Sequence, residues 1–258
     1  MPLTIQYCSD LHLEFVHNEK FMQKHPLEVK GDILLMAGDI VPFAEIDKHH
    51  YFFDFVADNY AAVYWVPGNH EYYNADIAER SGAFREKIRD NVFLLNNTTV
   101  PLAGDTELVC TTLWSKINPA DEWEVVRAMS DFHVITNNGH RFTINDFNRL
   151  HAESLSYLTG ALATGTAKHK IVMSHHIPTY MHYPPKYKGD LLSQAFASEQ
   201  FELIEQAGVH SWIFGHHHCN IPEFKIGGTH MLTNQLGYVK YGENKGFSRG
   251  RVVVVERG

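Results

Sequence analysis

The chain has 258 residues, of which 44% are hydrophobic and 20% charged, and this composition excludes a disordered or low-complexity protein. The formal net charge of −8 gives no overall attraction to nucleic acid or to an anionic membrane, so neither partner is indicated. No apolar run approaches the roughly 20 residues that a membrane-spanning helix requires.

Cysteine usage points to a reducing compartment. Cys8, Cys110 and Cys219 are odd in number and far apart, so they form no disulfide framework. The amino-terminal residues show no basic stretch followed by a long apolar one, and no signal peptide is expected. A cytoplasmic protein with a single domain over residues 1–258 is therefore predicted.

Five short apolar runs each end at a polar cluster, and each is typical of a strand that is buried on both faces. In chain order these runs cover residues 5–8, 33–37, 63–66, 171–173 and 212–214. Stretches with helical spacing lie between several of them, at residues 47–59, 76–90, 145–163 and 198–207. Asp146 is a candidate N-cap for the third of these helices. This alternation predicts a sheet-centred α/β fold.

The last part of the chain differs in pattern. Residues 223–226, 230–233 and 251–255 read as strands between glycine-rich turns, which predicts a more antiparallel sheet from the second half. Residues 118–138 are charged and aromatic and are predicted to cap a site. Residues 180–193 are rich in Pro, Tyr and Lys and are predicted to form a long loop, where substrate contacts are common.

Metal-ligand side chains gather at the ends of the five predicted strands. Ligands bind beyond the carboxyl ends of strands in such folds, and Asp-x-His pairs on an extended chain face the same side. Mixed nitrogen and oxygen donors suit Mn, Fe, Zn, Co or Ni. The candidate residues are Asp10, His12, Asp39, Asn69, His70, His175, His216 and His218.

The ordered series of motifs resembles the calcineurin-like metallophosphoesterase superfamily. The motifs are Asp10-x-His12, Gly38-Asp39, Gly68-Asn69-His70-Glu71, His175 and Gly215-His216-x-His218. Further segments are similar to a bacterial and phage-type branch of uncharacterised phosphoesterases: 111–114, 129–132, 174–179 and 234–238. The resemblance implies an α/β fold of two stacked mixed β-sheets flanked by helices.

The same resemblance implies a role for each motif residue. One metal ion is expected to be held by Asp10, His12, Asp39 and His218, and the second by Asp39, Asn69, His175 and His216. Asp39 is then the shared bridge, and His70 approaches the substrate phosphate or the leaving oxygen instead of binding metal. The cofactors implied are two divalent or mixed-valence ions, with Mn favoured and Fe, Zn, Ni or Co as alternatives.

Such a pair of ions would acidify a shared water, and the bridging hydroxide would attack phosphorus in line. The predicted function is therefore a dinuclear-metal-dependent phosphoric-ester hydrolase acting on a small phosphate ester, with Asp39 and His70 as the catalytic residues. Ser/Thr protein phosphatases continue Gly-Asp into x-x-Asp-Arg-Gly, whereas Pro42 stands here in place of that second Asp and the Arg is absent. This departure favours a phosphodiesterase.

Other readings remain open at this stage. They are a phosphomonoesterase or nucleotide phosphatase, a nuclease, and a non-catalytic interaction scaffold of the same fold. His176 and His217 neighbour predicted ligands but are expected to point away from the site, and Glu71 is expected to brace its loop. Tyr180, Tyr183, Lys186 and Tyr187 are candidate substrate contacts or residues of an ordinary solvated loop.

Overall fold

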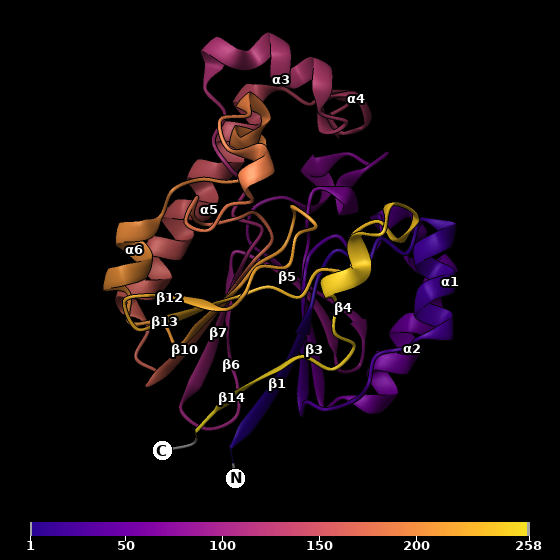
Figure 1. Cartoon of the computed structure of the whole chain (residues 1–258), viewed down its shortest axis with the longest axis vertical. Helices are drawn as coiled ribbons and strands as arrows, with labels where there is room; N and C mark the ends of the chain where they lie inside the picture. The colour runs from indigo at the N-terminus through magenta and orange to yellow at the C-terminus, as the bar shows by residue number, and fades with distance from the viewer. Residues whose placement is uncertain (1, 257–258) are drawn as a thin grey trace.

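The computed structural model describes residues 2–256, in which two six-stranded sheets pack face to face between helices (Figure 1). The first sheet has the order β14-β1-β2-β3-β5-β4 and the second β12-β13-β11-β10-β7-β6. The strands of the first sheet are β1 (Leu3–Cys8), β2 (Ile33–Ala37), β3 (Ala62–Val66), β4 (Phe84–Arg89), β5 (Val92–Asn96) and β14 (Val252–Val255). Those of the second are β6 (Thr98–Pro101), β7 (Thr106–Thr111), β10 (His169–Ser174), β11 (Ser211–Ile213), β12 (Phe224–Ile226) and β13 (Thr229–Leu232). A separate hairpin pairs β8 (Thr136–Asn137) with β9 (His140–Arg141).

Helices cover the outer face of each sheet. In Figure 1, α1 (Val16–Lys24) and α2 (His50–Asn59) lie to the right of the sheets, and α5 (Ile144–Thr164) and α6 (Phe201–Gln206) lie to the left. The short helices α3 (Glu122–Ala128) and α4 (Asp131–Val134) lie at the top of the view. The predicted fold of two mixed sheets flanked by helices is confirmed.

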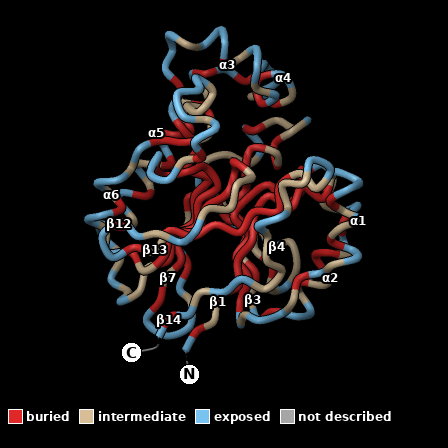
Figure 2. Tube along the Cα trace, in the orientation of Figure 1, coloured by how far each residue is buried: buried red, intermediate tan, exposed pale blue. Residues whose placement is uncertain are grey.

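The core follows from the two-residue period of the strands. Along β1, Leu3, Ile5 and Tyr7 face the space between the two sheets, while the alternate residue Cys8 faces the helices. β2 repeats this pattern, with Leu35 on the inner face and Met36 on the outer one. Figure 2 shows the resulting buried strands at the centre of the molecule, surrounded by exposed helices and loops.

All five predicted ligand strands exist, and each begins and ends within two residues of its predicted bounds. The helix predicted for residues 145–163 is α5, but its N-cap is Thr143. The prediction of Asp146 as N-cap is wrong by three positions, because Asp146 forms a capping box in which its side chain accepts from the backbone of Thr143. The helices predicted for residues 47–59 and 198–207 are shorter than expected, since a 3₁₀ helix (Phe43–His49) precedes α2 and α6 begins only at Phe201.

The helix predicted for residues 76–90 is wrong. The chain forms a 3₁₀ turn over Ile77–Arg80 and then strand β4, which pairs antiparallel with β5. Gly82 has a φ of +71°, which ends any helix, and the following residues Phe84 to Lys87 alternate between half-buried and exposed. A two-residue period at the edge of the sheet therefore outweighs the helix-forming composition.

The three strands predicted near the carboxyl terminus exist, and β12 pairs antiparallel with β13, but the second sheet is not more antiparallel than the first. β10 pairs parallel with β7 and β11, and β11 pairs parallel with β13. β14 leaves this sheet and pairs antiparallel with β1 of the first. Because the central strands of both sheets are parallel, their carboxyl ends meet on one side of the molecule.

Candidate metal centre

The loops that leave the strands turn their polar side chains into one space through left-handed backbone conformations. Asp10 and His12 follow β1 with φ values of 54° and 45°, and Asp39 follows β2 with a φ of 54°. His216 and His218 follow β11 with φ values of 84° and 51°. The sequence predicted that the pairs Asp10/His12 and His216/His218 are extended, and this reason is wrong. Asp10 and His12 nevertheless lie in one cluster, whereas His216 and His218 lie in different ones. The positive φ values, which Asp and His tolerate better than most residues, produce the convergence.

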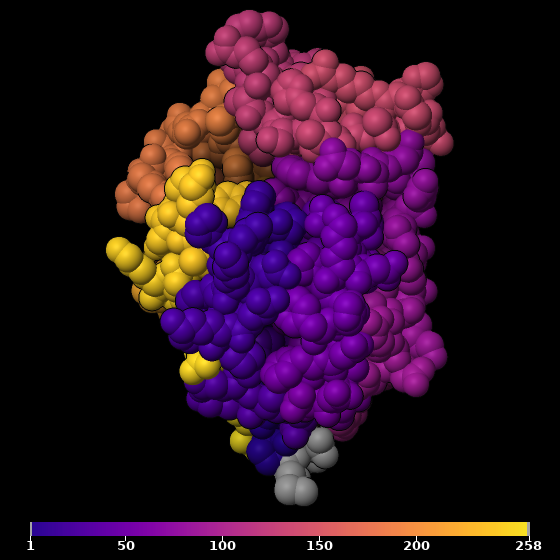
Figure 3. Space-filling view, turned by 90° about the vertical axis from the view of Figure 1, so that its right-hand side faces the viewer, coloured from indigo at the N-terminus to yellow at the C-terminus, as the bar shows by residue number. Residues whose placement is uncertain are grey.

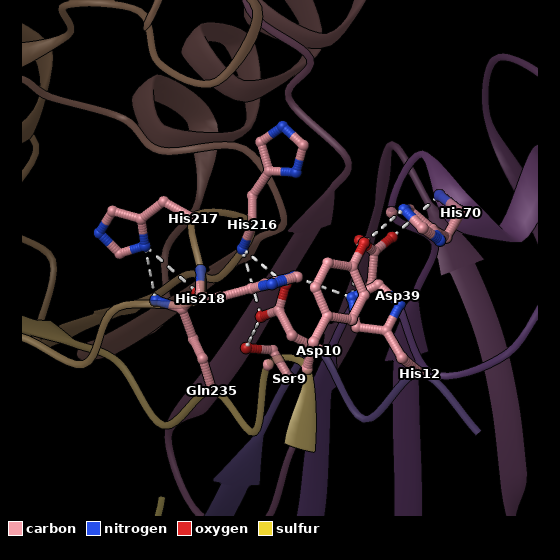
Figure 4. Close-up of polar contacts among 12 residues, drawn as sticks. Ser9, Asp10, His12, Asp39, His70, His216, His217, His218 and Gln235 are labelled. Carbon is pink, nitrogen blue, oxygen red and sulfur yellow. Dashed lines mark hydrogen bonds and ion pairs between the residues drawn. The ribbon is translucent and has the colours of Figure 1, made fainter. Parts of the chain in front are cut away.

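The first cluster joins Asp10, His12, Asp39 and His218, whose candidate ligand atoms all lie within 4.8 Å of one another. His12 Nε2 is 2.9 Å from His218 Nε2 and 3.6 Å from Asp39 Oδ2. His218 Nε2 is 3.5 Å from Asp10 Oδ1. Figure 4 shows these side chains converging above the ends of the strands.

A second cluster surrounds the other side of Asp39. His175 Nε2 lies 3.4 Å from the same oxygen of Asp39, Oδ2, and 3.3 Å from Asn69 Oδ1. His216 Nδ1 lies 3.0 Å from His175 Nε2. Asp39 Oδ2 thus faces both clusters, and the four residues predicted for the second ion are brought together around it.

The outer nitrogen atoms of the histidines in the first cluster are engaged by carboxylates. Nδ1 of His12 is 3.1 Å from Glu14 Oε1, and Nδ1 of His218 is 2.8 Å from Glu243 Oε2. A carboxylate accepts only, so each Nδ1 carries a proton, and in the neutral ring Nε2 presents a lone pair. Two lone pairs then face each other across 2.9 Å beside two carboxylates, which is an arrangement that fits a cation.

Backbone carbonyl groups fix the histidines of the second cluster in the same way. His175 Nδ1 donates to Ala37 O at 2.9 Å, and His216 Nε2 donates to Ala195 O at 3.3 Å. The remaining nitrogens, Nε2 of His175 and Nδ1 of His216, point at each other and toward Asp39. Burial alone would lower the pKa of His175, but the charge of Asp39 raises it to about 9. The negative charge of Asp39 that favours a proton on His175 Nε2 would equally favour a metal ion there, which would displace that proton. The donor set of both clusters fits two divalent cations.

Glu71 holds the Asp39 loop from behind, as the sequence predicted. Its Oε1 accepts from Ile40 N and Trp65 Nε1, and its Oε2 accepts from Asp39 N and Gly68 N, all within 2.7–3.0 Å. Burial, and then the charge of Asp39, raises the pKa of Glu71 to about 8. Four N–H donors nevertheless occupy its lone pairs, so we assign the carboxylate as ionised.

His70 lies beside the clusters. Its backbone N–H donates to Asp39 Oδ1 at 2.9 Å, while its ring stacks on Tyr73 with centroids 4.0 Å apart. Nδ1 is 3.1 Å from Glu14 Oε1, and Nε2 is 3.4 Å from the hydroxyl of Tyr238. Burial alone would lower the pKa of His70, but the charge of Asp39 and then the contact with Glu14 raise it to about 9.

A cavity of about 330 Å³ opens onto this centre. Segment 118–138 contributes Ala128 to Asp131 to its wall, and loop 180–193 contributes Tyr183 and Tyr187, so both predicted segments line the site. In the space-filling view, the pink segment that contains the short helices α3 and α4 lies above the indigo and purple amino-terminal half (Figure 3). Tyr180 and Lys186, the other two predicted contacts, do not line the cavity in the described chain.

Comparison with known proteins agrees with this architecture. Residues 3–220 match the family model described as calcineurin-like phosphoesterase. The chain belongs to this family. An uncharacterized protein of Acanthamoeba polyphaga mimivirus is 30% identical over 260 residues, which cover 91% of each chain.

Two solved structures share the calcineurin-like phosphoesterase fold. A phosphopantetheinyl hydrolase of Mycobacterium tuberculosis superposes with a TM-score of 0.68 at 15% identity, covering 97% of this chain and 95% of its own. A protein of Thermus thermophilus superposes with a TM-score of 0.50 at 14% identity over the whole of both chains. In this calcineurin-like phosphoesterase, none of the helices within residues 2–256 combines the length and apolar character needed to cross a bilayer.

The two histidines adjacent to candidate ligands behave differently in this calcineurin-like phosphoesterase. His217 points away from both clusters, as predicted, and its Nδ1 contacts the side chain of Gln235, although the residue also lines the cavity (Figure 4). His176 is fully buried, with its ring centroid 4.2 Å from that of His216 and 5.1 Å from that of Trp114. The prediction that His176 points away from the site is wrong, because a ring nitrogen of His176 lies within 4.8 Å of candidate ligand atoms of His175 and His216. Neither of its nitrogens has a hydrogen-bond partner within residues 2–256.

Sequence reasoning missed several residues that contact His70, Tyr73 or His218. These are Glu14, Tyr73, Asp131, Tyr238 and Glu243. Asp131 and Tyr238 fall in segments already similar to the phosphoesterase branch, and Glu14 continues the alternation Asp10-x-His12-x-Glu14, so three of the five carried a signal. Tyr73 and Glu243 carried none, because their positions depend on loops that pack from distant parts of the chain.

Proposed function

We propose that this chain is a dinuclear-metal-dependent phosphodiesterase that acts on a small phosphate ester. The proposal depends mainly on how four histidines are hydrogen-bonded. In each of them, one ring nitrogen contacts an oxygen acceptor that lies outside the metal-ligand set; the four are His12, His175, His216 and His218. The other ring nitrogen of each histidine points toward the carboxylates of Asp10 and Asp39. Lone pairs that are oriented in this way toward carboxylates are typical of metal ligands.

The assignment of ligands follows the two clusters. Asp10, His12, Asp39 and His218 would hold one ion, and Asp39, Asn69, His175 and His216 would hold the other. A bound pair of divalent ions, with manganese as our first choice, supplies an acidified water as nucleophile and offsets charge on the phosphate oxygens. Asp39 links both sets, so its carboxylate sets the spacing of the centre.

The chain's own residues handle the leaving group. His70 Nε2 faces the cavity, where a leaving oxygen would lie, while its backbone is tied to Asp39. As water oxygen bonds to phosphorus, the bond from phosphorus to the leaving oxygen breaks and its electron pair stays on that oxygen. A proton from His70 Nε2 then neutralises the leaving oxygen, a step that typically contributes about 10²–10⁴-fold in rate.

The charge of the cavity favours a diester. Its wall carries the carboxylates of Asp131, Asp190 and Glu243, and no Lys or Arg of residues 2–256 lines it. A phosphomonoester brings a second negative charge, and a nucleic acid brings many, so each would be repelled by these carboxylates more strongly than a diester would be. A diester with one charge and an apolar group suits the aromatic wall of Tyr73, Tyr183, Tyr187, Phe196 and Tyr238.

A cytoplasmic location is part of the proposal. Cys8, Cys110 and Cys219 are free, and the first two are buried. Unpaired cysteines are usual in a reducing compartment.

The proposal is tested with metal-free protein prepared by chelation. Hydrolysis of bis(p-nitrophenyl) phosphate should be lost on chelation, should return with Mn²⁺, and should exceed hydrolysis of p-nitrophenyl phosphate. His70→Ala should retain its metal content and should lose hydrolysis of a dialkyl phosphate, whose leaving alkoxide needs a proton that p-nitrophenolate does not need. A protein that binds no metal would be a scaffold, and one that prefers the monoester or a DNA substrate would overturn the diesterase assignment.

A further inference from the structure

Glu14 joins the first metal cluster to the candidate proton donor. Its Oε1 lies 3.1 Å from Nδ1 of His12 and also 3.1 Å from Nδ1 of His70. The side chain is 11% exposed, and its second oxygen, Oε2, is buried with no hydrogen-bond partner within residues 2–256. One carboxylate oxygen therefore serves two histidines that lie 58 residues apart in sequence.

The loop that carries Glu14 is itself fixed. Backbone N–H groups of His12 and Leu13 donate to the carbonyl groups of Asp39 and Ile40, each at 2.9 Å. This pairing ties the loop after β1 to the loop after β2. Because both Asp39 and Glu14 also bond to His70, any displacement of either loop would displace the His70 ring.

The His70 ring is held on its remaining sides by aromatic groups. Tyr73 stacks on it at an interplanar angle of 24°, and Phe15 packs edge-on with centroids 6.3 Å apart. With Nδ1 directed at Glu14, the opposite nitrogen, Nε2, must point into the cavity beside the hydroxyl of Tyr238. A carboxylate on one ring nitrogen fixes both the tautomer and the orientation of the other.

We propose that Glu14 is a positioning residue that orients the His70 ring so that Nε2 points at the leaving oxygen. The same carboxylate links the orientation of His70 to that of the metal ligand His12. This inference rests on the proposed phosphodiesterase function. A different reading of the same atoms is a third cation site, since His12, Glu14 and His70 also form a compact group of donors. The 3.1 Å separations favour hydrogen bonds, and metal counting distinguishes the two readings.

The experiment compares two leaving groups in Glu14→Gln. Departure of an alkoxide requires a proton, whereas departure of p-nitrophenolate does not, so misplacing His70 should affect only the first. We expect hydrolysis of a dialkyl phosphate to fall roughly 10–100-fold more than hydrolysis of bis(p-nitrophenyl) phosphate. Because Glu14→Gln also removes the acceptor of His12 Nδ1, hydrolysis of bis(p-nitrophenyl) phosphate at saturating Mn²⁺ should fall, but by no more than in the control variant described next.

Glu243→Gln is the matched control. Glu243 holds Nδ1 of His218 as Glu14 holds Nδ1 of His12, but it makes no contact with His70 in the described chain. Its replacement should weaken metal binding and slow both leaving groups by the same factor. The double variant Glu14→Gln with His70→Ala should show the same ratio of dialkyl-ester to nitrophenyl-ester rates as His70→Ala alone, because both changes remove protonation of the leaving group.

An NMR measurement that does not require catalysis tests the contact between Glu14 and His70 independently of the proposed phosphodiesterase function. In Zn²⁺-loaded protein, the Nδ1–H proton of His70 should give a slowly exchanging NMR signal that is absent in Glu14→Gln. If the wild-type protein shows this signal but hydrolyses no ester, the proposed phosphodiesterase function is wrong, whereas the hydrogen bond between Glu14 and His70 is supported. Equal slowing of both leaving groups in Glu14→Gln, or a third metal ion that this variant loses, would overturn the role of Glu14.

Discussion

Asp39 and His70 are joined by a hydrogen bond of 2.9 Å from the backbone N–H of His70 to Oδ1, while Oδ2 faces His12 and His175. One carboxylate thus uses one oxygen to fix the candidate proton donor and the other to link both candidate ion sites. An isosteric change at position 39 should therefore disturb metal binding and catalysis together.

We expect Asp39→Asn to lower metal content from two ions per chain to one or fewer, because the amide removes a negative charge that both ions would share. Elemental analysis after equilibration with Mn²⁺ measures this directly. His70→Ala is the control, since it should keep both ions. An Asp39→Asn protein that retained two ions would show that Asp39 is not the bridge.

Gly38 allows the Asp39 loop to approach His175. A Cβ at position 38 would overlap Nδ1 of His175, and the φ of Gly38 is +86°. Gly82 provides a matched control, because its φ is +71° but no heavy atom of the described chain lies within 4 Å of an added Cβ. Gly82→Ala should lower the free energy of unfolding by about 1–2 kcal/mol, the cost of the left-handed backbone alone.

Gly38→Ala should lose at least twice that free energy and should also lose metal, because His175 must move away. Urea unfolding and elemental analysis of the two variants give both numbers. Equal effects of the two substitutions would show that backbone conformation, and not contact with His175, determines the cost.

Glu71→Gln tests the brace behind the metal centre. A glutamine N–H₂ group in place of either oxygen would face two N–H donors that have lost their acceptor. Each buried donor left unpaired costs about 1–3 kcal/mol, so we expect a loss of several kcal/mol in urea unfolding. The exposed Glu79→Gln should change stability by less than about 0.5 kcal/mol. A Glu71→Gln protein of wild-type stability would indicate a protonated Glu71.

His151 makes the stability of the fold depend on pH. Burial lowers the pKa of His151, whose Nδ1 lies 3.2 Å from the carbonyl groups of Leu113 and Trp114. Below about pH 6.5 the unfolded chain binds a proton at this position that the folded chain does not, so stability falls as the pH is lowered. The slope from one such group reaches at most about 1.4 kcal/mol per pH unit.

His151→Gln should therefore narrow the difference in unfolding free energy between about pH 8 and about pH 5.5, a range that spans the unfolded pKa of histidine. Comparing each protein with itself at the two pH values separates this effect from any loss of packing, which is present at both. An unchanged pH dependence in the variant would show that His151 titrates alike in the folded and unfolded chains.

The central strands were predictable because buried parallel strands read as unbroken apolar runs, such as residues 33–37. The motif residues at their ends were predictable for the same reason, since the carboxyl ends of parallel strands meet. β4 was not predictable from composition, because Phe84 to Arg89 pack as an edge strand against β5 only once the sheet exists. β5, β6 and β7 were likewise not assigned, and they complete the two sheets.

Within the site, residue identity was easier to predict than geometry. The convergence of Asp10 and His12 was predicted, but their left-handed backbone was not, because no local spacing encodes it. Glu243 lies behind His218, and Glu14 lies behind both His12 and His70, only because loops from opposite ends of the chain pack together. Side chains that orient ligands from behind are therefore the part of such a centre that sequence patterns miss.

The left-handed backbone at Asp10, His12, Asp39, His216 and His218 has a consequence for protein engineering. Each of these residues costs of order 1–3 kcal/mol relative to a relaxed backbone, and glycine would relieve that cost. A library of variants screened for heat tolerance in the presence of a chelator should therefore accumulate glycine at these five positions. The same library screened with ions present should reject those substitutions. The presence of ions during selection would therefore decide whether the protein gains thermal stability at the cost of metal binding.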